Sequence, residues 1–485
     1  MIRFLLNDRE VTLADFDPQT TVLDWLRQEQ GLCGTKEGCA SGDCGACTVV
    51  VAEAGQDGLV YQSMNSCIAF LGSLHGRQVI TVEHLADDTV LHPVQQAMVD
   101  LHGSQCGYCT PGFVMSLFAL SKSSEDADSR SPLHRVHDWL GGNLCRCTGY
   151  RPIIDAAMTV IQGPAEDRFD RQSMATQEAL RSIAAKGSSE TGGNRFLIPS
   201  SVTELGEALA DYPTARLLAG GTDLALDVTQ GLRSLEKIIL LDRVPEMKTV
   251  VTENDALTVG AAVSLTACRD IFAGHYPAID ELLGRFGSRQ VRNQGTLGGN
   301  IANASPIGDL PPVMLALGAD VCLQSRRGSR NMPLDGFFLG YRKTALDSGE
   351  FVRSIRIPLP TEGQFFRVYK VSKRLDDDIS AVCIAINLML ETSAEQTRVV
   401  SARIGVGGMA AIPKRAPGCE RELCDKPFIP SVIEAAAKAL AEEFEPIDDA
   451  RASAGYRTRV AQNLLKRCFL EWQGADGPLR VSNVR

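Results

Sequence analysis

Short runs in which apolar and polar residues alternate dominate the first 90 residues. A helical pattern begins at Thr21 and continues through Trp25 and Leu26. The alternation predicts four strands, over residues 2–6, 11–16, 48–52 and 78–82. A small sheet wrapped on one helix is typical of a β-grasp fold, so we expect a ferredoxin-like domain over residues 1–90.

The pattern changes to helical periodicity after residue 90. Proline stands at the beginning of each apolar run, where its fixed φ suits the first turn of a helix and its missing N–H costs no hydrogen bond. Four helices are predicted, over residues 93–101, 111–120, 132–140 and 152–161. Residues 91–162 are therefore expected to form a small helical bundle.

Small and polar residues fill 163–194, which predicts a tether between modules with room for a short helix in its early part. Strands and helices then alternate over 195–364, beginning with a strand at 216–219. A closing α+β region is expected over 365–485. Its predicted elements are strands at 381–390 and 402–406 and a helix at 430–443.

Composition narrows the class of protein. The 485 residues suffice for about three domains. The net charge of −10 and the absence of basic runs argue against nucleic acid and anionic membrane surfaces as partners. Neither a signal peptide nor a run of about 18 apolar residues is visible, so a cytoplasmic location is predicted. In a reducing compartment, the 15 cysteines are expected to be metal ligands or buried thiols.

Eight of these cysteines lie in the first 150 residues and form two sets of four. The first set has C-x4-C-x2-C spacing with one distant member, the pattern of a plant-type [2Fe-2S] cluster: Cys39, Cys44, Cys47 and Cys67. Glycines between them let the backbone fold around a cluster. Cys33 also lies nearby, but its use would break the spacing and leave Cys67 unexplained. We therefore predict that Cys33 is a bystander.

The second set combines C-x2-C with C-x-C: Cys106, Cys109, Cys145 and Cys147. Each pair precedes a predicted helix, so all four thiolates are expected near helix N-termini, where the dipole favours negative charge. Taken alone, this set suits a tetrahedral zinc ion as well as iron. Its position beside a ferredoxin-like module favours a second iron–sulfur cluster.

Two glycine-rich segments lie in the middle region, and neither has the G-x-G-x-x-G fingerprint of a Rossmann domain. Each is read either as a tight turn or as a site where amide groups approach a pyrophosphate. Asp309 is read first as a helix cap, with a ribityl hydroxyl as the alternative partner. The charged run 370–378 is expected to be a solvated loop, or else a loop beside a flavin.

The segments 38–48, 105–112, 142–152, 217–224 and 296–300 together resemble the molybdenum hydroxylases. The order of modules is similar to that of the iron–sulfur and flavin part of the xanthine dehydrogenases. This resemblance implies a multidomain α+β fold. Its parts are a β-grasp [2Fe-2S] domain, a helical-bundle [2Fe-2S] domain, and an FAD domain of the vanillyl-alcohol-oxidase type with a C-terminal α+β subdomain.

The resemblance also implies the cofactors, which are two [2Fe-2S] clusters held by the eight cysteines and one FAD. The implied FAD contacts are Leu217, Leu218, Ala219, Gly220, Gly221, Thr222, Asp223, Leu224, Phe286, Thr296, Leu297, Gly298, Gly299, Asn300, Asp309 and Lys370. No catalytic acid or base is expected in this chain. Electrons are expected to pass from the second cysteine set through the first to FAD and then to NAD.

Since the chain stops after the flavin region, the resemblance places xanthine or hypoxanthine hydroxylation on a molybdopterin-binding large subunit. The expected assembly is a heterotetramer of two small and two large chains, with Gln105 facing the pterin. An aldehyde or aromatic hydroxylase subunit, a stand-alone NADH-dependent reductase and a zinc-bound scaffold are the alternatives.

Overall fold

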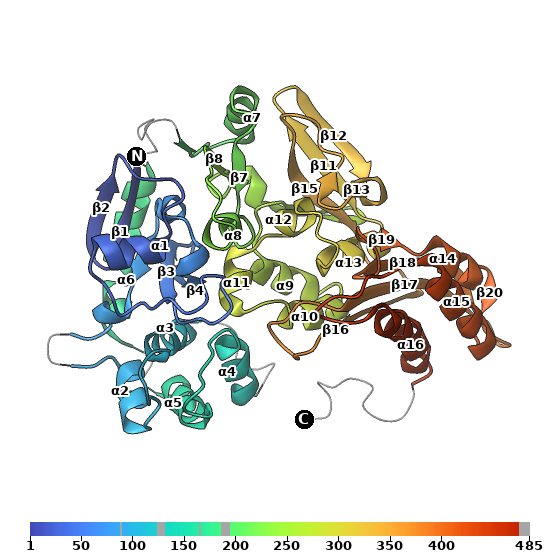
Figure 1. Cartoon of the computed structure of the whole chain (residues 1–485), viewed down its shortest axis with the longest axis horizontal. Helices are drawn as coiled ribbons and strands as arrows, with labels where there is room; N and C mark the ends of the chain where they lie inside the picture. The colour runs from blue at the N-terminus through green and yellow to red at the C-terminus, as the bar shows by residue number, and fades with distance from the viewer. Residues whose placement is uncertain (88–89, 124–130, 164–165, 186–194, 475–485) are drawn as a thin grey trace. The chain divides into compact units, whose positions relative to one another are not determined.

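The computed structural model of the chain describes residues 1–87, 90–123, 131–163, 166–185 and 195–474. Its fold divides into two compact units (Figure 1). The first contains Met1–Val244 and Gly287–Gly295, and the second contains Pro245–Phe286 and Thr296–Arg485. Each unit is described by itself below.

The chain begins with a mixed five-stranded sheet in the order β2-β1-β5-β3-β4. Its strands are β1 (Ile2–Leu6), β2 (Arg9–Leu13), β3 (Thr48–Ala54), β4 (Leu59–Asn65) and β5 (Gln78–Ile80). Thr21 caps α1 (Val22–Asp24), which continues as the π-helical turn Trp25–Glu29. The ring of Trp25 packs edge-on against Phe4, with 5.3 Å between ring centroids. The predicted β-grasp domain is therefore present.

The second strand begins earlier than predicted, because Leu6 pairs directly with Arg9 across a two-residue turn. Asn7 adopts φ 57° in this turn, a conformation that asparagine tolerates better than most residues. The prediction of a strand over 11–16 is wrong in its bounds, and β4 was not predicted.

The four predicted helices are confirmed as α2 (Pro93–Asp100), α3 (Thr110–Ser121), α4 (Pro132–Leu140) and α5 (Arg151–Gln162). Each carries proline in its first turn. Helix α3 lies at the centre of the bundle, since nine of its twelve residues are buried. Its apolar side chains form one core with α2, α4 and α5.

The predicted tether contains an 18-residue helix, α6 (Arg168–Ala185), longer than the short helix expected there. Leu180 and Ile183 of α6 bury against Leu5 of the β-grasp sheet. Before α6, Asp167 accepts a hydrogen bond from His92 at 2.7 Å and pairs with Lys122 at 2.6 Å. The early part of this segment is thus fixed to the first unit, and the glycines at 187 and 192–193 lie outside the described residues.

The first unit also contains a three-stranded parallel sheet in the order β6-β8-β7. Its elements are β6 (Phe196–Leu197), α7 (Val202–Asp211), β7 (Arg216–Leu218), α8 (Leu224–Thr229) and β8 (Ile238–Leu240). The helix α11 (Arg289–Gln294) belongs to this unit as well, although Pro245–Phe286 of the second unit precede it in sequence.

The second unit is built on two sheets. The first has the order β12-β11-β15-β10-β9, and the second has the order β16-β17-β18-β19, with β20 paired to β18. The strands are β9 (Val250–Glu253), β10 (Ala256–Gly260), β11 (Asp320–Ser325), β12 (Gly328–Pro333), β13 (Phe338–Gly340), β14 (Lys343–Thr344), β15 (Phe351–Pro358), β16 (Gln364–Val371), β17 (Val382–Thr392), β18 (Thr397–Gly407), β19 (Lys414–Arg415) and β20 (Lys426–Pro427).

Helices cover both sheets of the second unit. They are α9 (Leu265–Ala273), α10 (Pro277–Gly284), α12 (Leu297–Ala302), α13 (Leu310–Leu317), α14 (Pro417–Leu423), α15 (Pro430–Glu443) and α16 (Ala454–Trp472). The last three pack against β16–β18 (Figure 1) and share one apolar core with them. The predicted strands at 381–390 and 402–406 and the helix at 430–443 are confirmed, whereas α16 was not predicted.

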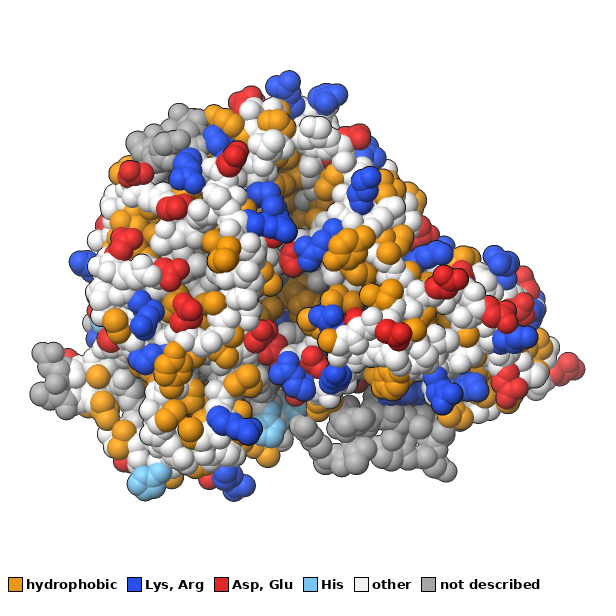
Figure 2. Space-filling model, viewed as in Figure 1, with side chains coloured by type: hydrophobic (Ala, Val, Ile, Leu, Met, Phe, Trp, Pro, Cys, Tyr) orange, Lys and Arg blue, Asp and Glu red, His pale blue; other side chains and the backbone are white. Residues whose placement is uncertain are grey.

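Acidic and basic side chains are interspersed over the face shown in Figure 2, without a broad area of one sign. Within the described part of the chain, no helix combines the length and the apolar character needed to cross a membrane.

The buried imidazole of His75 predicts how stability varies with pH. Its Nδ1 accepts a hydrogen bond from the Arg3 N–H at 3.1 Å. Burial, followed by the charges of Arg243, the N-terminus and Arg3, lowers the pKa of His75 to about 4. The unfolded chain therefore binds the extra proton first, and stability falls as the pH drops from about 6.5 towards 4.

The variant His75→Gln should remove about 2 kcal/mol of this loss between pH 7 and pH 4, as measured by urea denaturation at each pH. If the free energy of unfolding falls equally with pH in the variant and in the wild type, His75 is not the cause of this loss.

Candidate functional site

The first cysteine loop has a backbone that only glycine accommodates at several points. Gly42 and Gly45 adopt φ 84° and 68°, in the left-handed region. A Cβ atom on Gly38 would lie 2.6 Å from Sγ of Cys44, so a larger residue there would occupy the space of the thiol. The N–H groups of Ser41 and Asp43 point at Sγ of Cys39, at 3.4 and 3.3 Å. Such donors stabilise a thiolate or a sulfur-bound metal.

The four thiols of the first set lie close together. Cys67, carried by the short turn Ser66–Ile68 after β4, places its Sγ 3.2 Å from that of Cys47. This contact lowers the pKa of Cys47 despite complete burial. The thiols of Cys44 and Cys67 likewise lower the pKa of Cys39. The same thiol–thiol contacts raise the pKa of Cys44 and Cys67, so the four sulfurs share their protons as one coupled group.

Cys33 lies apart from this group. Its side chain is exposed, and its Sγ contacts only the backbone oxygen of Arg27, at 3.9 Å. The buried Cys67, by contrast, is 2% exposed.

The second set forms two close pairs, Cys106 with Cys147 and Cys109 with Cys145. Cys109 stands at the N-cap of α3. Burial and the Cys145 thiol nevertheless raise the pKa of Cys109 to about 12. Burial opposes ionisation of Cys145 too, but hydrogen bonds from the hydroxyl and N–H of Thr148 lower its pKa overall.

Of the four thiols expected at helix N-termini, that of Cys109 stands at an N-cap, whereas Cys106 and Cys147 stand four residues before α3 and α5 and Cys145 stands six residues before α5. Helix α5 begins only at Arg151, and Tyr150 before it adopts φ 69°. Gln105, which directly precedes Cys106, is exposed.

The two cysteine loops are in direct contact. The N–H of Leu144 donates to the carbonyl oxygen of Cys44 at 3.0 Å. Because Leu144 directly precedes Cys145, this bond joins a cysteine of the first loop to the neighbour of a cysteine of the second. This approach depends on glycine, because a Cβ atom on Gly45 would lie 2.2 Å from the Gly142 oxygen. A Cβ atom on Gly112 of α3 would lie equally close to the Gly45 oxygen.

The first glycine-rich segment, 217–224, joins β7 to α8 in the same unit. Gly221 adopts φ 79°, and a Cβ atom on Gly220 would lie 1.6 Å from the Gln294 carbonyl oxygen. Leu218 belongs to the same apolar cluster as Cys47 and Cys67. This segment and the first cysteine set therefore share one packed core.

The second glycine-rich segment, 296–300, lies in the second unit. Thr296 caps α12 by accepting from the Gly299 N–H at 3.1 Å. Gly298 packs so closely on Ala261 that a Cβ atom would lie 2.7 Å from the Ala261 Cα. The buried Oδ1 of Asn300 has no hydrogen-bond partner. An unpaired buried acceptor is costly, so this oxygen is suited to a ligand that donates a hydrogen bond, such as a ribityl hydroxyl.

The structure brings together three residues predicted as separate flavin contacts. Asp309 and Lys370 form a buried ion pair of 2.6 Å, with side chains 4% and 3% exposed. The Lys370 ammonium lies 5.8 Å from the centre of the Phe286 ring. The second carboxylate oxygen of Asp309 accepts from Ser380 at 2.5 Å.

Two expectations about this cluster are wrong. Asp309 stands at the N-cap of α13 but makes no capping hydrogen bond, because Lys370 and Ser380 hold its carboxylate. Lys370 is not part of a solvated loop, since it ends the buried stretch of β16. Arg285 anchors the following loop by donating to the carbonyl oxygens of Lys370 and Leu375, both at 2.9 Å.

Sequence reasoning missed Arg285, Ser380 and Gln290 as residues of these sites. Arg285 precedes the predicted Phe286, which is a weak signal. No sequence signal marks Ser380 or Gln290, since each meets its hydrogen-bond partners only through tertiary folding.

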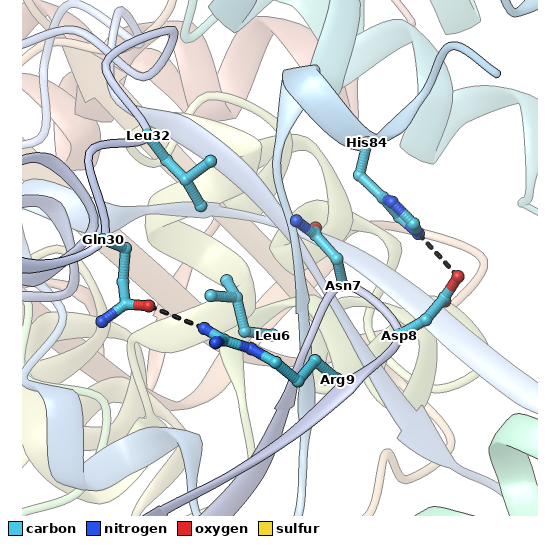
Figure 3. Close-up of a pocket in the computed structure, with 7 residues that line it drawn as sticks. All are labelled: Leu6, Asn7, Asp8, Arg9, Gln30, Leu32 and His84. Atoms are coloured by element: carbon cyan, nitrogen blue, oxygen red, sulfur yellow. Dashed lines mark hydrogen bonds and ion pairs between the residues drawn. The ribbon is translucent and has the colours of Figure 1, made fainter. Parts of the chain in front are cut away.

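Among the described residues, no group of three or more His, Cys, Asp or Glu side chains is arranged to hold a single metal ion. A surface hollow of about 450 Å³ lies at the β1–β2 turn (Figure 3), where His84 contacts Asp8 and Arg9 contacts Gln30. It contains none of the predicted site residues.

Four family models match the chain. They are a 2Fe-2S iron–sulfur cluster binding domain over residues 4–71, a [2Fe-2S] binding domain over 81–158, an FAD binding domain in molybdopterin dehydrogenase over 189–360, and a CO dehydrogenase flavoprotein C-terminal domain over 367–472.

Two relatives are similar over most of this chain. Xanthine dehydrogenase of Emericella nidulans is 35% identical over 91% of the chain, and xanthine dehydrogenase/oxidase of Rattus norvegicus is 31% identical over 92%. The alignments cover 36% and 37% of these relatives, so the chain spans little more than a third of their length.

Two solved structures match the fold. A chain of carbon monoxide dehydrogenase from Hydrogenophaga pseudoflava matches 56% of this chain and 94% of its own, with TM-score 0.53 and 30% identity. Quinoline 2-oxidoreductase from Pseudomonas putida 86 matches 58% of this chain and 97% of its own chain, with TM-score 0.53 and 29% identity.

The separation of Cys33 from Cys67 gives a test of the first ligand set. Cys67→Ser should abolish the electron paramagnetic resonance signal of one reduced cluster, because the substitution removes a buried sulfur that lies close to the other three thiols of the set. Cys33→Ser, the matched control, should keep both signals. The reverse result would show that the loop is assigned wrongly.

The buried Asp309–Lys370 pair gives a second test. Asp309→Ala should lower the free energy of unfolding by about 3–5 kcal/mol, because the Lys370 ammonium stays buried without its carboxylate. Combining Asp309→Leu with Lys370→Met should recover much of that loss. The control is Glu391→Ala at the exposed pair with Arg398, expected to cost under about 1 kcal/mol in the same urea titration. Similar losses for both single variants would contradict the argument.

Proposed function

Because the chain belongs to the molybdenum hydroxylase family, as its iron–sulfur and flavin part, we propose that it carries electrons from a molybdopterin-binding partner to NAD. It has two 2Fe-2S domains and an FAD-binding domain. When bound, these cofactors supply one-electron transfer at iron and the exchange of one or two electrons at the flavin. The chain's own residues hold them and set their surroundings.

The observation that supports this proposal most directly is the arrangement of loops in the first unit. The Cys44 oxygen accepts from Leu144, next to a cysteine of the second set. The first set also shares an apolar core with Leu218 of the flavin segment. The first set thus contacts both the second set and this segment, as an electron relay through the chain requires.

We propose the following cysteine ligands for the two clusters. The first cluster is held by Cys39, Cys44, Cys47 and Cys67, and the second by Cys106, Cys109, Cys145 and Cys147. Both glycine-rich segments contribute FAD contacts. In the second unit, Asp309 and Lys370 form a buried ion pair whose ammonium lies near the Phe286 ring, and we propose that these three residues contact the flavin.

The proposed substrate of the complete enzyme is xanthine or hypoxanthine, since the relatives that match over about 90% of this chain are named xanthine dehydrogenases. Hydroxylation takes place on the partner, in an assembly of two small and two large chains in the cytoplasm. The proposed domains are 1–90, 91–162 and 195–485, with the linker 163–194 and a subdomain boundary at 364.

The purified chain should contain about four iron atoms, about four labile sulfides and about one FAD. It should reduce an artificial dye with NADH and leave xanthine unchanged. Addition of the molybdopterin-binding partner should then restore NAD reduction by xanthine. Stoichiometric zinc without iron would contradict the cofactor assignment. Xanthine turnover by the lone chain would contradict the division of labour, and faster reduction of oxygen than of NAD would make the assembly an oxidase.

A further inference from the structure

Helix α11 comes from the flavin part of the sequence but packs on the iron–sulfur domains. Asn293 donates to the Ser63 carbonyl oxygen at 2.9 Å, and the Asn65 N–H donates to Gln294 at 3.2 Å. Both partners lie in β4, just before Cys67. The helix is therefore seated beside the first cysteine set.

One side chain of α11 reaches between the two cysteine loops. Gln290 is fully buried, and its Nε2 donates to Asn143 at 2.9 Å and to Ser116 at 3.2 Å, with Thr48 at 3.4 Å. A Cβ atom on Gly142 would lie 2.3 Å from Oε1 of Gln290. Gln290 thus fills the space above Gly142 that a larger residue would occupy.

The partners of Gln290 connect it to both loops. Asn143 donates to the Gly45 oxygen at 3.1 Å, and the Thr48 hydroxyl donates to the same oxygen at 2.7 Å. Ser116 donates to Oδ1 of Asn143 at 2.6 Å. All four side chains are buried, so losing one donor leaves acceptors that water cannot reach.

This network holds the peptide that joins the loops. Asn143 immediately precedes Leu144, whose N–H donates to Cys44, and Cys145 follows. Displacement of Asn143 would move a cysteine of the second set relative to the first. Electron exchange between two centres falls exponentially with their separation, so a small displacement matters.

We propose that Gln290 is a positioning residue that holds the two cysteine loops together and thereby sets the electronic coupling between the two clusters. The inference rests on the proposed function, because it requires a cluster at each cysteine set. It assigns to the flavin part of the sequence a role in the iron–sulfur part.

The test compares Gln290→Met with Asn293→Met. The first variant keeps the length of the side chain and removes the donors to the loops. The second removes a hydrogen bond of the same helix to β4 and is the matched control. Iron, sulfide and FAD contents are measured first, followed by low-temperature electron paramagnetic resonance of the fully reduced protein and the midpoint potential of each cluster.

Gln290→Met should lose the mutual broadening of the two cluster signals and shift at least one midpoint potential, whereas Asn293→Met should match the wild type. If Gln290→Met does not fold, Ser116→Ala should show the same changes in weaker form. Wild-type spectra and potentials in the Gln290 and Ser116 variants, or equal changes in the Asn293 control, would overturn the inference. A wild-type chain without two paramagnetic centres would contradict the proposed function and this inference with it.

Discussion

The hydrogen bond from the Leu144 N–H to the Cys44 oxygen is the contact on which the arrangement of the iron–sulfur part depends. It joins the backbone of one cysteine loop to that of the other, without an intervening side chain. Because the backbones approach this closely, a Cβ atom on Gly45 or Gly112 would clash with a backbone oxygen, whereas a Cβ atom on Gly142 would clash with the side chains of Gln290 and Ser288. Side chains from four separate segments, Thr48, Ser116, Asn143 and Gln290, form hydrogen bonds with one another around the contact.

The polar character of this region is notable because the surrounding cores are apolar. Thr48, Ser116, Asn143 and Gln290 are all buried, yet each has a hydrogen-bond partner in the network. Such a polar network favours one packing geometry, because a shifted partner leaves a further buried group unpaired. An apolar contact of the same size would tolerate sliding, and the distance between the cysteine sets would then vary.

The cluster near Phe286 in the second unit contains a buried charged pair, whereas the network around Gln290 in the first unit consists of neutral side chains. The Asp309–Lys370 pair is nearly inaccessible to water, and Ser380 satisfies the other carboxylate oxygen. Such a pair gains little net stability, because desolvation of both charges offsets their attraction. The pair instead places a cation, the Lys370 ammonium, near the Phe286 ring at the end of β16. Arg285 holds the loop that follows, so the position of Lys370 is fixed from both sides.

Local sequence determined much of this protein. The prolines that begin α2–α5 and the apolar residues of β1 and β3 depend on neighbours only a few residues away, and these predicted elements agree with the structure. The C-x4-C-x2-C spacing is equally local, and the ligand set read from it stays a prediction. Tertiary structure alone decided the role of Asp309, the burial of Lys370 and the place of Gln290. Each of these side chains meets partners more than 60 residues distant in sequence. No local pattern encodes such a contact, because it exists only once separate elements have packed together.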